Sequence, residues 1–477
     1  MTPMPAYKKL IAYPGPIVIL GFGSIGQGTL PVLLRHFDIA PSQVTIIAAD
    51  ADGAEIAKEY GVAHVIERLT RKNFEPVLDR YLAGGGFLLN VSVEVESLAL
   101  IKYCGKRGVL YIDTVTEPWP GRSEDPSLSP SRRSNYALRE EVLAYARQKP
   151  NGPTAVITMG ANPGLASAWM KQGLWNIALD RGMSMDKKPA TREQWARLAR
   201  RLGIKVIHVA ERDTQTAARR KQWGEFLNTW SVNGFIGEGL QPAELGWGSH
   251  ERHFPQDGAR HGFGCDAAIL LDRPGAATLV RSWTPLEGPY HGFLITHAES
   301  ISIADYLTLR ESTGELAYRP TVHYAYHPSD DTVLSLHEAA GNNWKPNESE
   351  RVVGPDEIVD GADELGVLLM GNKKGAYWYG SRLTIDEARK LAPHNSATSL
   401  QVVAGILAGM VLAIREPTAG VVEPDQLDHE EVLKIAAPFL GEQVGVYGDW
   451  TPLKDRMTLF GADIDADPWQ FKNFRVR

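Results

Sequence analysis

The stretch that decides the fold is IVILGFGSIG at residues 17–26, followed by a helical run and by VTIIAAD at residues 44–50. An apolar, β-branched run of this kind is typical of a buried parallel strand. Gly21 permits a tight turn, Gly23 lets a pyrophosphate approach the backbone, and Gly26 lets the next helix pack on the strand. The order strand, glycine turn, helix and second strand predicts a dinucleotide-binding unit.

The residues around this turn also predict which dinucleotide binds. A pyrophosphate would rest on the N–H groups at the start of the helix, at Ser24 and Ile25. The second strand ends at Asp50, 24 residues after Gly26, near the place of the carboxylate that binds the adenosine ribose. Because a carboxylate repels a 2′-phosphate, Asp50 favours NAD, and Asp52 competes for the same role. The alternative is a structural glycine turn without a ligand.

Length and composition limit the remaining possibilities. The 477 residues are too many for one ordinary core, so we expect two or three domains. A net charge of −7 argues against a nucleic-acid partner. The two cysteines fit a reducing cytosol, and we expect a cytoplasmic protein without a secretory signal. The apolar run at 400–414 is too short to span a membrane and reads as a buried helix, so no membrane partner is expected.

Residues 1–160 alternate strand and helix. The expected strands lie at residues 17–20, 44–50, 62–66, 87–93, 109–114 and 154–158. Strands joined by helical crossovers form a doubly wound parallel sheet, here a Rossmann-type α/β domain.

The pattern changes after residue 160. Residues 161–395 predict an α+β substrate and dimerisation domain with a largely antiparallel sheet. Its expected strands include 205–210, 226–232, 267–271, 277–283 and 293–297. The apolar helix at 399–416 is expected to return to the first domain, and residues 417–477 to form a helical and irregular extension.

Ligands bind outside the C-terminal ends of parallel strands. Polar residues at those ends are therefore candidates for contacts with the cofactor or the substrate. For the cofactor they are Asn90, Ser92, Asp113, Thr114, Thr158 and Asn162, and for the substrate Glu94, Glu117 and Asn162.

The second domain contains many acids and few bases around its aromatic residues. The candidates there are Glu211, Trp230, Glu238, His297 and Glu299. Carboxylates that pair with an ammonium group and an indole face that holds it are typical of a site for a small cation. A metal site at His297 is not expected, because the spacing matches no HxH or HExxH motif.

Several segments resemble those of the bacterial homospermidine synthases, which belong to the saccharopine dehydrogenase-like group. They are GFGSIG at 21–26, DTVTEPW at 113–119, GANPG at 160–164, AERDTQ at 210–215, NTWSV at 228–232, QPAELGWG at 241–248, THAESISIAD at 296–305 and HYAYHP at 323–328. The resemblance implies a homodimer that keeps NAD bound and makes homospermidine from two putrescine molecules, with release of ammonia.

The resemblance also implies which residues bind putrescine. They are Glu117, Asn162, Glu211, Trp230, Glu238 and His297, and Glu94 stands where the family usually has an aspartate. We expect Glu117, Glu211, Trp230 and His297 to be catalytic. Either Glu211 or His297 could be the general base. Whether spermidine also serves as a donor stays open.

Two other functions remain possible from the sequence. A net dehydrogenase of the saccharopine or carboxynorspermidine type would need an arginine clamp for a carboxylate. Arg212 is the nearby candidate, and Asp213 could neutralise it. A non-catalytic NAD-binding regulator would not need an acid-rich pocket beside a tryptophan.

Overall fold

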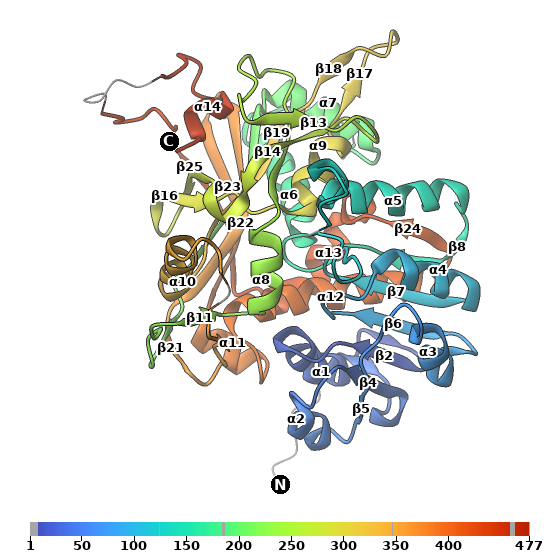
Figure 1. Cartoon of the computed structure of the whole chain (residues 1–477). Coiled ribbons are helices and arrows are strands. Elements are labelled where there is room, and N and C mark those ends of the chain that lie inside the picture. Colours follow the sequence, from blue (N-terminus) through green and yellow to red (C-terminus); the bar gives the residue numbers. More distant parts are fainter. Residues whose placement is uncertain (1–7, 124, 184–186, 346, 458–462, 477) are drawn as a thin grey trace.

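The chain folds around two β-sheets, shown in Figure 1 with the parallel sheet below the larger mixed sheet. The structure is a computed structural model that describes residues 8–123, 125–183, 187–345, 347–457 and 463–476.

The first sheet is parallel throughout, which confirms the predicted Rossmann-type fold. In spatial order its strands are β24 (Ala419–Val422), β8 (Gly152–Val156), β7 (Val109–Asp113), β6 (Gly86–Asn90), β2 (Ile17–Leu20), β4 (Val44–Ala48) and β5 (Ala63–Ile66). Its helices are α1 (Ser24–His36), α2 (Ala54–Glu59), α3 (Phe74–Leu82), α4 (Ser97–Arg107), α5 (Asn135–Gln148) and α12 (Ala397–Arg415).

The central strand β2 is apolar at every position because both of its faces are covered. Ile17 and Ile19 belong to the same core cluster as residues of α1 and α12. Val18 and Leu20 belong to a second cluster with residues of α3 and α4. Successive residues of a strand point to opposite faces, so an unbroken apolar run fits a sheet between two helical layers.

The second sheet has ten strands and is largely antiparallel, as predicted. Its main path is β13 (Gly258–Arg260), β14 (Ala268–Pro274), β12 (Pro242–Gly246), β19 (Thr321–His327), β9 (Val206–Asp213), β22 (Ala362–Asn372), β23 (Gly375–Thr384) and β25 (Glu442–Gly448), with the hairpin β15 (Leu279–Thr284) and β16 (Gly288–Phe293) beside it. β9 and β19 form a parallel pair within it. This pair places residues of both strands on one face.

Helices and short strand pairs surround this sheet. The helices are α6 (Leu165–Asp180), α7 (Arg192–Leu202), α8 (Val232–Gly239), α9 (Ala298–Tyr306), α10 (Asp330–Gly341), α11 (Ile385–Leu391), α13 (His429–Ala436) and α14 (Phe471–Phe474). The short pairs are β1 (Ile11–Ala12) with β3 (Phe37–Asp38), β10 (Thr216–Ala217) with β21 (Ile358–Asp360), β11 (Glu225–Asn228) with β20 (Ser349–Val352), and β17 (Leu309–Arg310) with β18 (Leu316–Tyr318).

The prediction for residues 417–477 was incomplete, because this segment adds a strand to each sheet. β24 extends the parallel sheet beside β8, and β25 pairs with β23 in the second sheet. Figure 1 shows β24 beside β8 at the edge of the parallel sheet, although the two strands lie far apart in the sequence. β24 has only four residues, and β25 has glycine at two of its positions, so neither segment has a run of apolar residues as clear as those of the predicted strands.

Several expected strand limits in the second domain were wrong. β9 continues to Asp213, three residues beyond the expected end, so Glu211 lies inside a strand. β11 ends at Asn228, and Ser231 caps α8 by accepting the N–H of Gly234. Residues 294–297 follow the end of β16 and lead into α9. β9 continues through polar residues because they pair with β19 and β22, whereas the cap of α8 sets the end of the segment after β11. Apolar content alone reveals neither limit.

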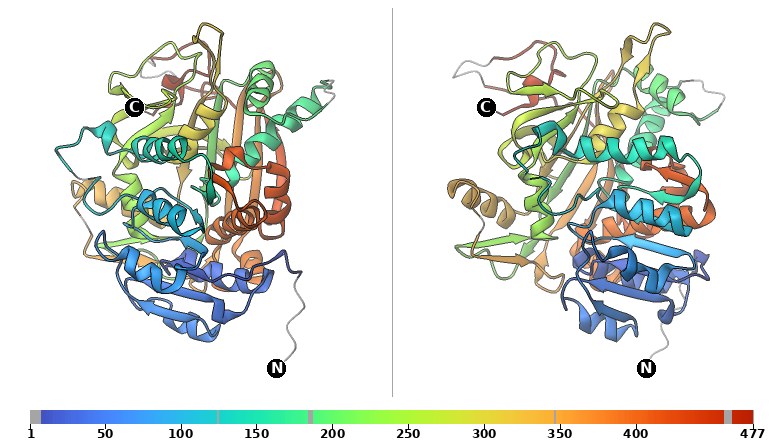
Figure 2. Two further views of the ribbon diagram at one scale, coloured as in Figure 1. Left: turned by 90° about the vertical axis from the view of Figure 1, so that its right-hand side faces the viewer. Right: turned by 45° about the vertical axis from the view of Figure 1, so that its right-hand side comes forward.

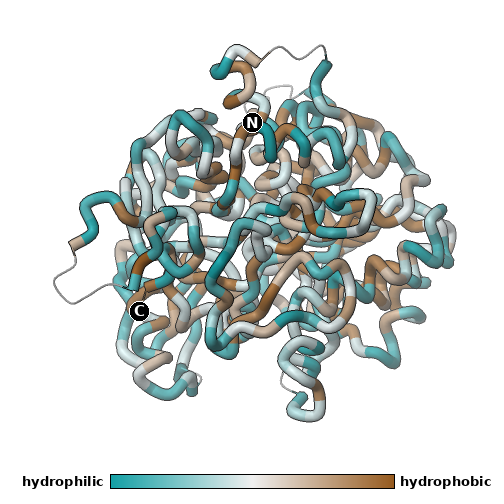
Figure 3. Tube along the Cα trace, turned by 90° about the horizontal axis from the view of Figure 1, so that it is seen from above, coloured by the Kyte–Doolittle hydropathy of each residue, from teal (hydrophilic) through white to brown (hydrophobic). Residues whose placement is uncertain are grey.

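Helix α12 packs against both parts of the molecule. It lies on α1 and on strands β7 and β8, and it also touches β22 and β23. Its length and composition would suffice to cross a membrane, but 83% of its most apolar window is buried inside the protein. The views in Figure 2 show it between the two sheets, and Figure 3 shows apolar segments concentrated inside the molecule. α12 is therefore a shared core helix.

Candidate active site

Glycines shape the turn between β2 and α1. Gly21 has a φ of +89°, and a Cβ atom there would lie 2.7 Å from the backbone of Ser92. A Cβ atom on Gly26 would lie 2.8 Å from the carbonyl oxygen of Gly21. At Gly23 a Cβ atom would meet no atom of the described residues within 4 Å. Packing therefore requires glycine at two of these positions, while Gly23 borders open space.

The start of α1 faces this open space. The N-cap residue of the helix is Gly23, and no side chain caps its first turn. Gly23, Ser24 and Ile25 all line a large cleft of about 1380 Å³. Because unpaired N–H groups and the helix dipole give this end a positive partial charge, the turn is suited to a phosphate group.

Two carboxylates follow β4 on the same cleft. Asp50 and Asp52 both line it and are exposed, and Asp50 Oδ1 accepts the backbone N–H of Asp52 at 3.0 Å. Arg68 and Arg71 line the cleft as well. The cleft therefore offers groups of both charges, with the acids immediately after the second strand.

A buried network supports the ends of β6 and β7. Asn90 Oδ1 accepts the hydroxyl and N–H groups of Ser92, and Asn90 Nδ2 donates to the Tyr111 hydroxyl at 3.3 Å. Tyr111 in turn donates to Asp113 Oδ2 at 2.8 Å, and the N–H of Thr158 donates to Asp113 Oδ1 at 2.6 Å. Burial raises the pKa of Asp113 to about 6, although these donors oppose the change. The network fixes the loops beside the cleft.

The predicted cofactor residues thus fall into two groups. Those that line the cleft are Gly21, Gly23, Ser24, Ile25, Asp50 and Ser92. Those that stand outside its lining are Gly26, Asn90, Asp113, Thr114, Thr158 and Asn162. Most residues of the second group lie in the strand ends and turns next to the residues that line the cleft. Asn162 instead contacts Glu211, which is described below.

Glu117 and Glu94 lie on neighbouring loops of the cleft. Glu117 Oε2 accepts the backbone N–H of Glu94 at 3.2 Å. The Glu94 side chain is half exposed and lies 4.0 Å from Arg68. Burial raises the pKa of Glu117 to about 8, and the negative charge of Glu238 adds to this increase. A cation bound nearby would therefore stabilise the ionised form of Glu117.

Glu211 is a buried acid near the C-terminal end of β9. Its Oε2 atom accepts a hydrogen bond from Asn162 Nδ2 at 2.9 Å and another from the Tyr324 hydroxyl. Burial raises the pKa of Glu211, and the neighbouring Asp213 raises it further. This carboxyl group is thus able to exchange a proton near neutral pH.

His297 lies between two carboxylates. Its Nε2 atom is 3.2 Å from Glu238 Oε2, and its Nδ1 atom is 3.2 Å from Glu299 Oε1. Burial favours the neutral ring, but the two carboxylates outweigh this effect and raise the pKa of His297 to about 10. The ring is therefore an imidazolium that donates from both nitrogens.

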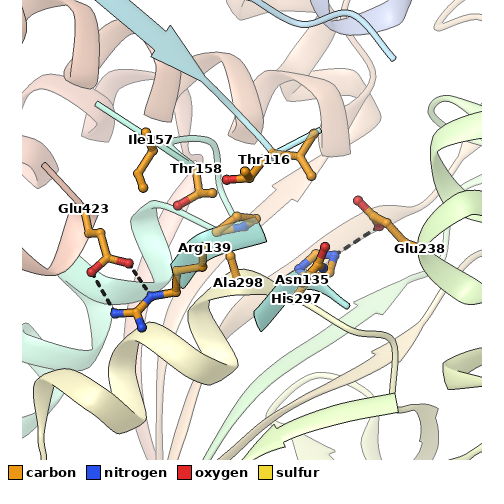
Figure 4. A pocket seen from close by; sticks show the side chains of 11 residues that line it. Thr116, Asn135, Arg139, Ile157, Thr158, Glu238, His297, Ala298 and Glu423 are labelled. Carbon is orange, nitrogen blue, oxygen red and sulfur yellow. Dashed lines mark hydrogen bonds and ion pairs between the residues drawn. The ribbon is translucent and has the colours of Figure 1, made fainter. Parts of the chain in front are cut away.

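A small cavity of about 10 Å³ adjoins the large cleft at this point. Figure 4 shows Glu238 and His297 on one side of it and Arg139, paired with Glu423, on the other. Thr158 also lines it. Glu238 lines both cavities, so it connects His297 with the large cleft.

Trp230 joins the site through a row of aromatic residues. Its indole N–H donates to the Tyr326 hydroxyl at 3.2 Å. The rings of Tyr326 and Tyr324 stack with their centroids 5.1 Å apart, and the ring of Tyr324 lies 4.4 Å from that of His297. Trp230 is half-buried and contacts the main core cluster.

The cleft brings the two predicted halves of the site together. Glu94, Glu117 and Glu238 line the same cleft as the glycine turn. Asn162, Glu211, Trp230, His297 and Glu299 are not among the described residues that line it. His297 contacts Glu238, and hydrogen bonds and ring contacts connect the other four to His297. Glu94, Glu117 and Glu238 thus line the cleft together with the glycine turn at 21–26, and the buried polar residues around Glu211 and His297 lie behind them.

Comparison with known proteins shows which family has this sequence and fold. The family model "Saccharopine dehydrogenase NADP binding domain" matches residues 17–156, and "Saccharopine dehydrogenase C-terminal domain" matches residues 160–449. Homospermidine synthase of Blastochloris viridis is 53% identical, with 100% of each chain covered. That of Mesorhizobium japonicum is 50% identical over 99% of this chain and 98% of its own.

The chain belongs to the homospermidine synthase family. A crystal structure of the homospermidine synthase from Legionella pneumophila in complex with NAD has a TM-score of 0.92 and 52% identity, covering 98% of this chain and 99% of its own. These findings confirm the resemblance inferred from the sequence segments.

Sequence reasoning missed Tyr324 and Tyr326. The segment at 323–328 had contributed to the resemblance to the homospermidine synthases, but its tyrosines received no role. In β19 these two tyrosines alternate with Ala325, and in the parallel pairing Tyr326 stands opposite Glu211. The alternation indicates that the two tyrosines lie on the same face of a strand. That this strand pairs with β9 is known only from the structure.

Proposed function

We propose that this chain is a homospermidine synthase, which transfers an aminobutyl group from one putrescine to another and releases ammonia. The observation that carries the proposal is that Glu117 and Glu238 line the same cleft as the glycine turn at 21–26. A diamine bound by these acids would lie beside a bound nicotinamide. Membership of the family supports the same activity.

We propose NAD as the bound cofactor. The open space at Gly23 and the uncapped start of α1 fit a pyrophosphate. Asp50 and Asp52 on the cleft would repel a 2′-phosphate, which supports NAD although the matching family model is named for NADP. The Legionella relative was solved with NAD.

The reaction is balanced without an external oxidant. When bound, NAD supplies the acceptor and later the donor of one hydride. Putrescine loses this hydride from the carbon beside one amine, and a proton from that amine, and becomes an imine. The amine of a second putrescine adds to that carbon, ammonia leaves, and the new imine takes back the hydride together with a proton. Two putrescine molecules thus give homospermidine and ammonia.

The acids of the cleft would hold the substrate cations. Glu117 has a raised pKa because it is buried near Glu238, so an ammonium group between them would stabilise both charges. Glu94 presents its backbone to Glu117 and its side chain to Arg68. We therefore assign Glu94 a secondary role at the cleft entrance.

Glu211 is the better general base of the two candidates. Both nitrogens of His297 face carboxylates, so the ring has no free lone pair to accept a proton. Glu211 has a raised pKa, which suits a group that takes a proton from the substrate amine, and Asn162 and the Tyr324 hydroxyl both donate to its Oε2 atom. We propose that His297 stays charged and holds Glu238 and Glu299 in place.

Trp230 would keep the reactive imine in the pocket. An indole face attracts an iminium or ammonium group without donating a proton to it. The bond from the indole N–H to Tyr326 fixes the ring in one orientation. This role needs no contact between Trp230 and the cofactor.

We further propose that the enzyme is a homodimer in the cytoplasm. The dimer is implied by the resemblance to the bacterial enzymes, and the location by the two cysteines, which fit a reducing cytosol. Putrescine is the proposed substrate, and spermidine is a second aminobutyl donor to be tested with it.

An assay with putrescine and a small amount of NAD separates the possible activities. Ammonia and homospermidine would be quantified by chromatography, and NADH by its absorbance. Homospermidine without accumulating NADH supports the proposal, whereas NADH formed in proportion to putrescine indicates a net dehydrogenase. NAD binding without turnover indicates a regulator. Arg212, the candidate for a carboxylate clamp, already contacts Asp330 and the carbonyl oxygen of Asp213.

A further inference from the structure

Tyr324 occupies a position that connects the proposed catalytic groups. Its hydroxyl donates to Glu211 Oε2. Its ring lies between the stacked ring of Tyr326, at an interplanar angle of 8°, and the ring of His297, tilted by 34°. Tyr324 is only 3% exposed. The ring is therefore held by two ring contacts, and its hydroxyl is directed at Glu211.

The bond from Tyr324 matters because Glu211 lies among other acids. Asp213 follows on the same strand and shares its face, and Asp363 on β22 is paired in register with Asp213. Both of these carboxyl groups are fully buried. Without donors, Glu211 would hold a proton at neutral pH and could not accept another.

The groups that influence Glu211 come from several elements. They are Asn162 before α6, Asp213 on β9, Tyr290 on β16, His297 before α9, Tyr324 and Tyr326 on β19, and Asp363 on β22. Burial raises the pKa of Glu211 most, and the Tyr324 hydroxyl is the strongest influence that lowers it, ahead of Asn162 and His297. Tyr324 itself stays protonated, because burial raises the pKa of its phenol well above the usual value.

We propose that Tyr324 is a positioning residue for the reaction, whose hydroxyl group keeps Glu211 ionised and able to accept the proton of the substrate amine. The inference rests on the proposed function, because it assigns Glu211 as the base. It adds a residue that acts through Glu211 and touches neither the cofactor nor the reacting carbon. Phenylalanine at position 324 would keep the packing of the ring but would lose the hydrogen bond to Glu211.

The test is the pH dependence of the first hydride transfer. Enzyme loaded with NAD is mixed rapidly with saturating putrescine, and NADH absorbance is followed between mildly acidic and alkaline pH. Tyr324→Phe removes one donor to a charged acceptor, so the ascending limb of the profile should move up by about one pH unit. The rate should fall at neutral pH and recover at higher pH.

Two matched changes isolate the hydroxyl group. Tyr326→Phe removes a hydroxyl from the adjacent stacked ring but leaves the bond to Glu211, so the limb should stay in place whatever happens to the rate. Incorporation of 3-fluorotyrosine in place of Tyr324 makes the phenol a stronger donor and should move the limb to lower pH. Thermal melting of each protein verifies that it is folded.

The outcomes separate this inference from the proposed function. Opposite shifts for Tyr324→Phe and for fluorotyrosine support the inference. A Tyr324→Phe enzyme with a uniformly lower rate and an unmoved limb overturns it, and so does an unmoved limb with fluorotyrosine should Tyr324→Phe not fold. The proposed function fails instead if the wild-type protein forms no homospermidine, which is measured in the same preparation.

Discussion

At the scale of single residues, the indole of Trp230 is held by one hydrogen bond to Tyr326 beside a pocket of acids. We expect Trp230→Ala to lower turnover of putrescine by about 30-fold, because a desolvated cation–π contact is worth about 2 kcal/mol. Trp230→Phe should lose much less, since phenylalanine keeps a weaker π-face. Steady-state kinetics of both variants provide the measurement. Equal losses would mean that Trp230 only fills space.

The raised pKa of Glu117 predicts how substrate binding depends on pH. Below its pKa of about 8 the free carboxyl group is mostly neutral, and above it the group is ionised and binds a diamine cation better. The KM for putrescine should therefore fall as the pH rises from 6 to 8, by up to about tenfold per pH unit. Glu117→Gln should raise the KM and flatten this dependence while NAD binding is kept. A wild-type KM that stays constant over this range would contradict the assignment.

Much of the site was predictable at this scale, for different reasons. Glycines and acids around residues 21–50 follow a spacing set by the covalent geometry of a strand, turn and helix, so the sequence reveals them. Glu117, Glu211 and His297 were candidates from their positions in the sequence, but their joint role in binding putrescine came from the resemblance, because they meet only in the fold. The tyrosines of β19 were missed since their role depends on the pairing of that strand with β9.

At the scale of elements, different glycines of the turn between β2 and α1 serve packing and cofactor binding. Gly23→Ala adds a methyl group where no atom lies within 4 Å and where φ is −71°, which alanine adopts readily. This variant should fold normally but bind NAD at least about tenfold more weakly, because the methyl group occupies the space of the pyrophosphate. Calorimetric titration with NAD gives the affinity.

Gly26→Ala is the matched comparison for this prediction. Its Cβ atom would lie 2.8 Å from the carbonyl oxygen of Gly21, so it should lower the melting temperature. If Gly23→Ala bound NAD as tightly as the wild type, the phosphate site would have to lie elsewhere.

At the scale of the whole molecule, α12 connects the two sheets. A Cβ atom on Gly405 of this helix would lie 2.0 Å from the carbonyl oxygen of Gly160, which begins the turn that contains Asn162. Gly405→Ala should therefore cost about 1–3 kcal/mol of stability by overpacking and disturb the site as well. Gly341→Ala at the end of α10 meets no atom within 4 Å in the part of the chain that the structure describes, and it serves as the control. Denaturant unfolding measures the stability of both variants. A Gly405→Ala protein as stable as the wild type would contradict the assignment of α12 as a core helix shared by the two sheets.

The architecture was predictable where patterns are long and regular. The parallel sheet and α12 follow from apolar runs at 17–20, 44–48 and 397–415. The strands β24 and β25 were not predictable, because a short segment with glycine becomes a strand only when a sheet edge is available. The path of the C-terminal segment back to both sheets is a property of the complete fold.

The central claim is that one bound NAD takes a hydride from the substrate and returns it to the product. The direct measurement uses putrescine deuterated at both amine-bearing carbons, together with an excess of unlabelled NADH in solution, and determines the mass of the homospermidine. Retention within one site predicts a product that keeps every deuterium atom. A product that has lost one deuterium per molecule would show that the reduced cofactor exchanges with solution, and would contradict the account.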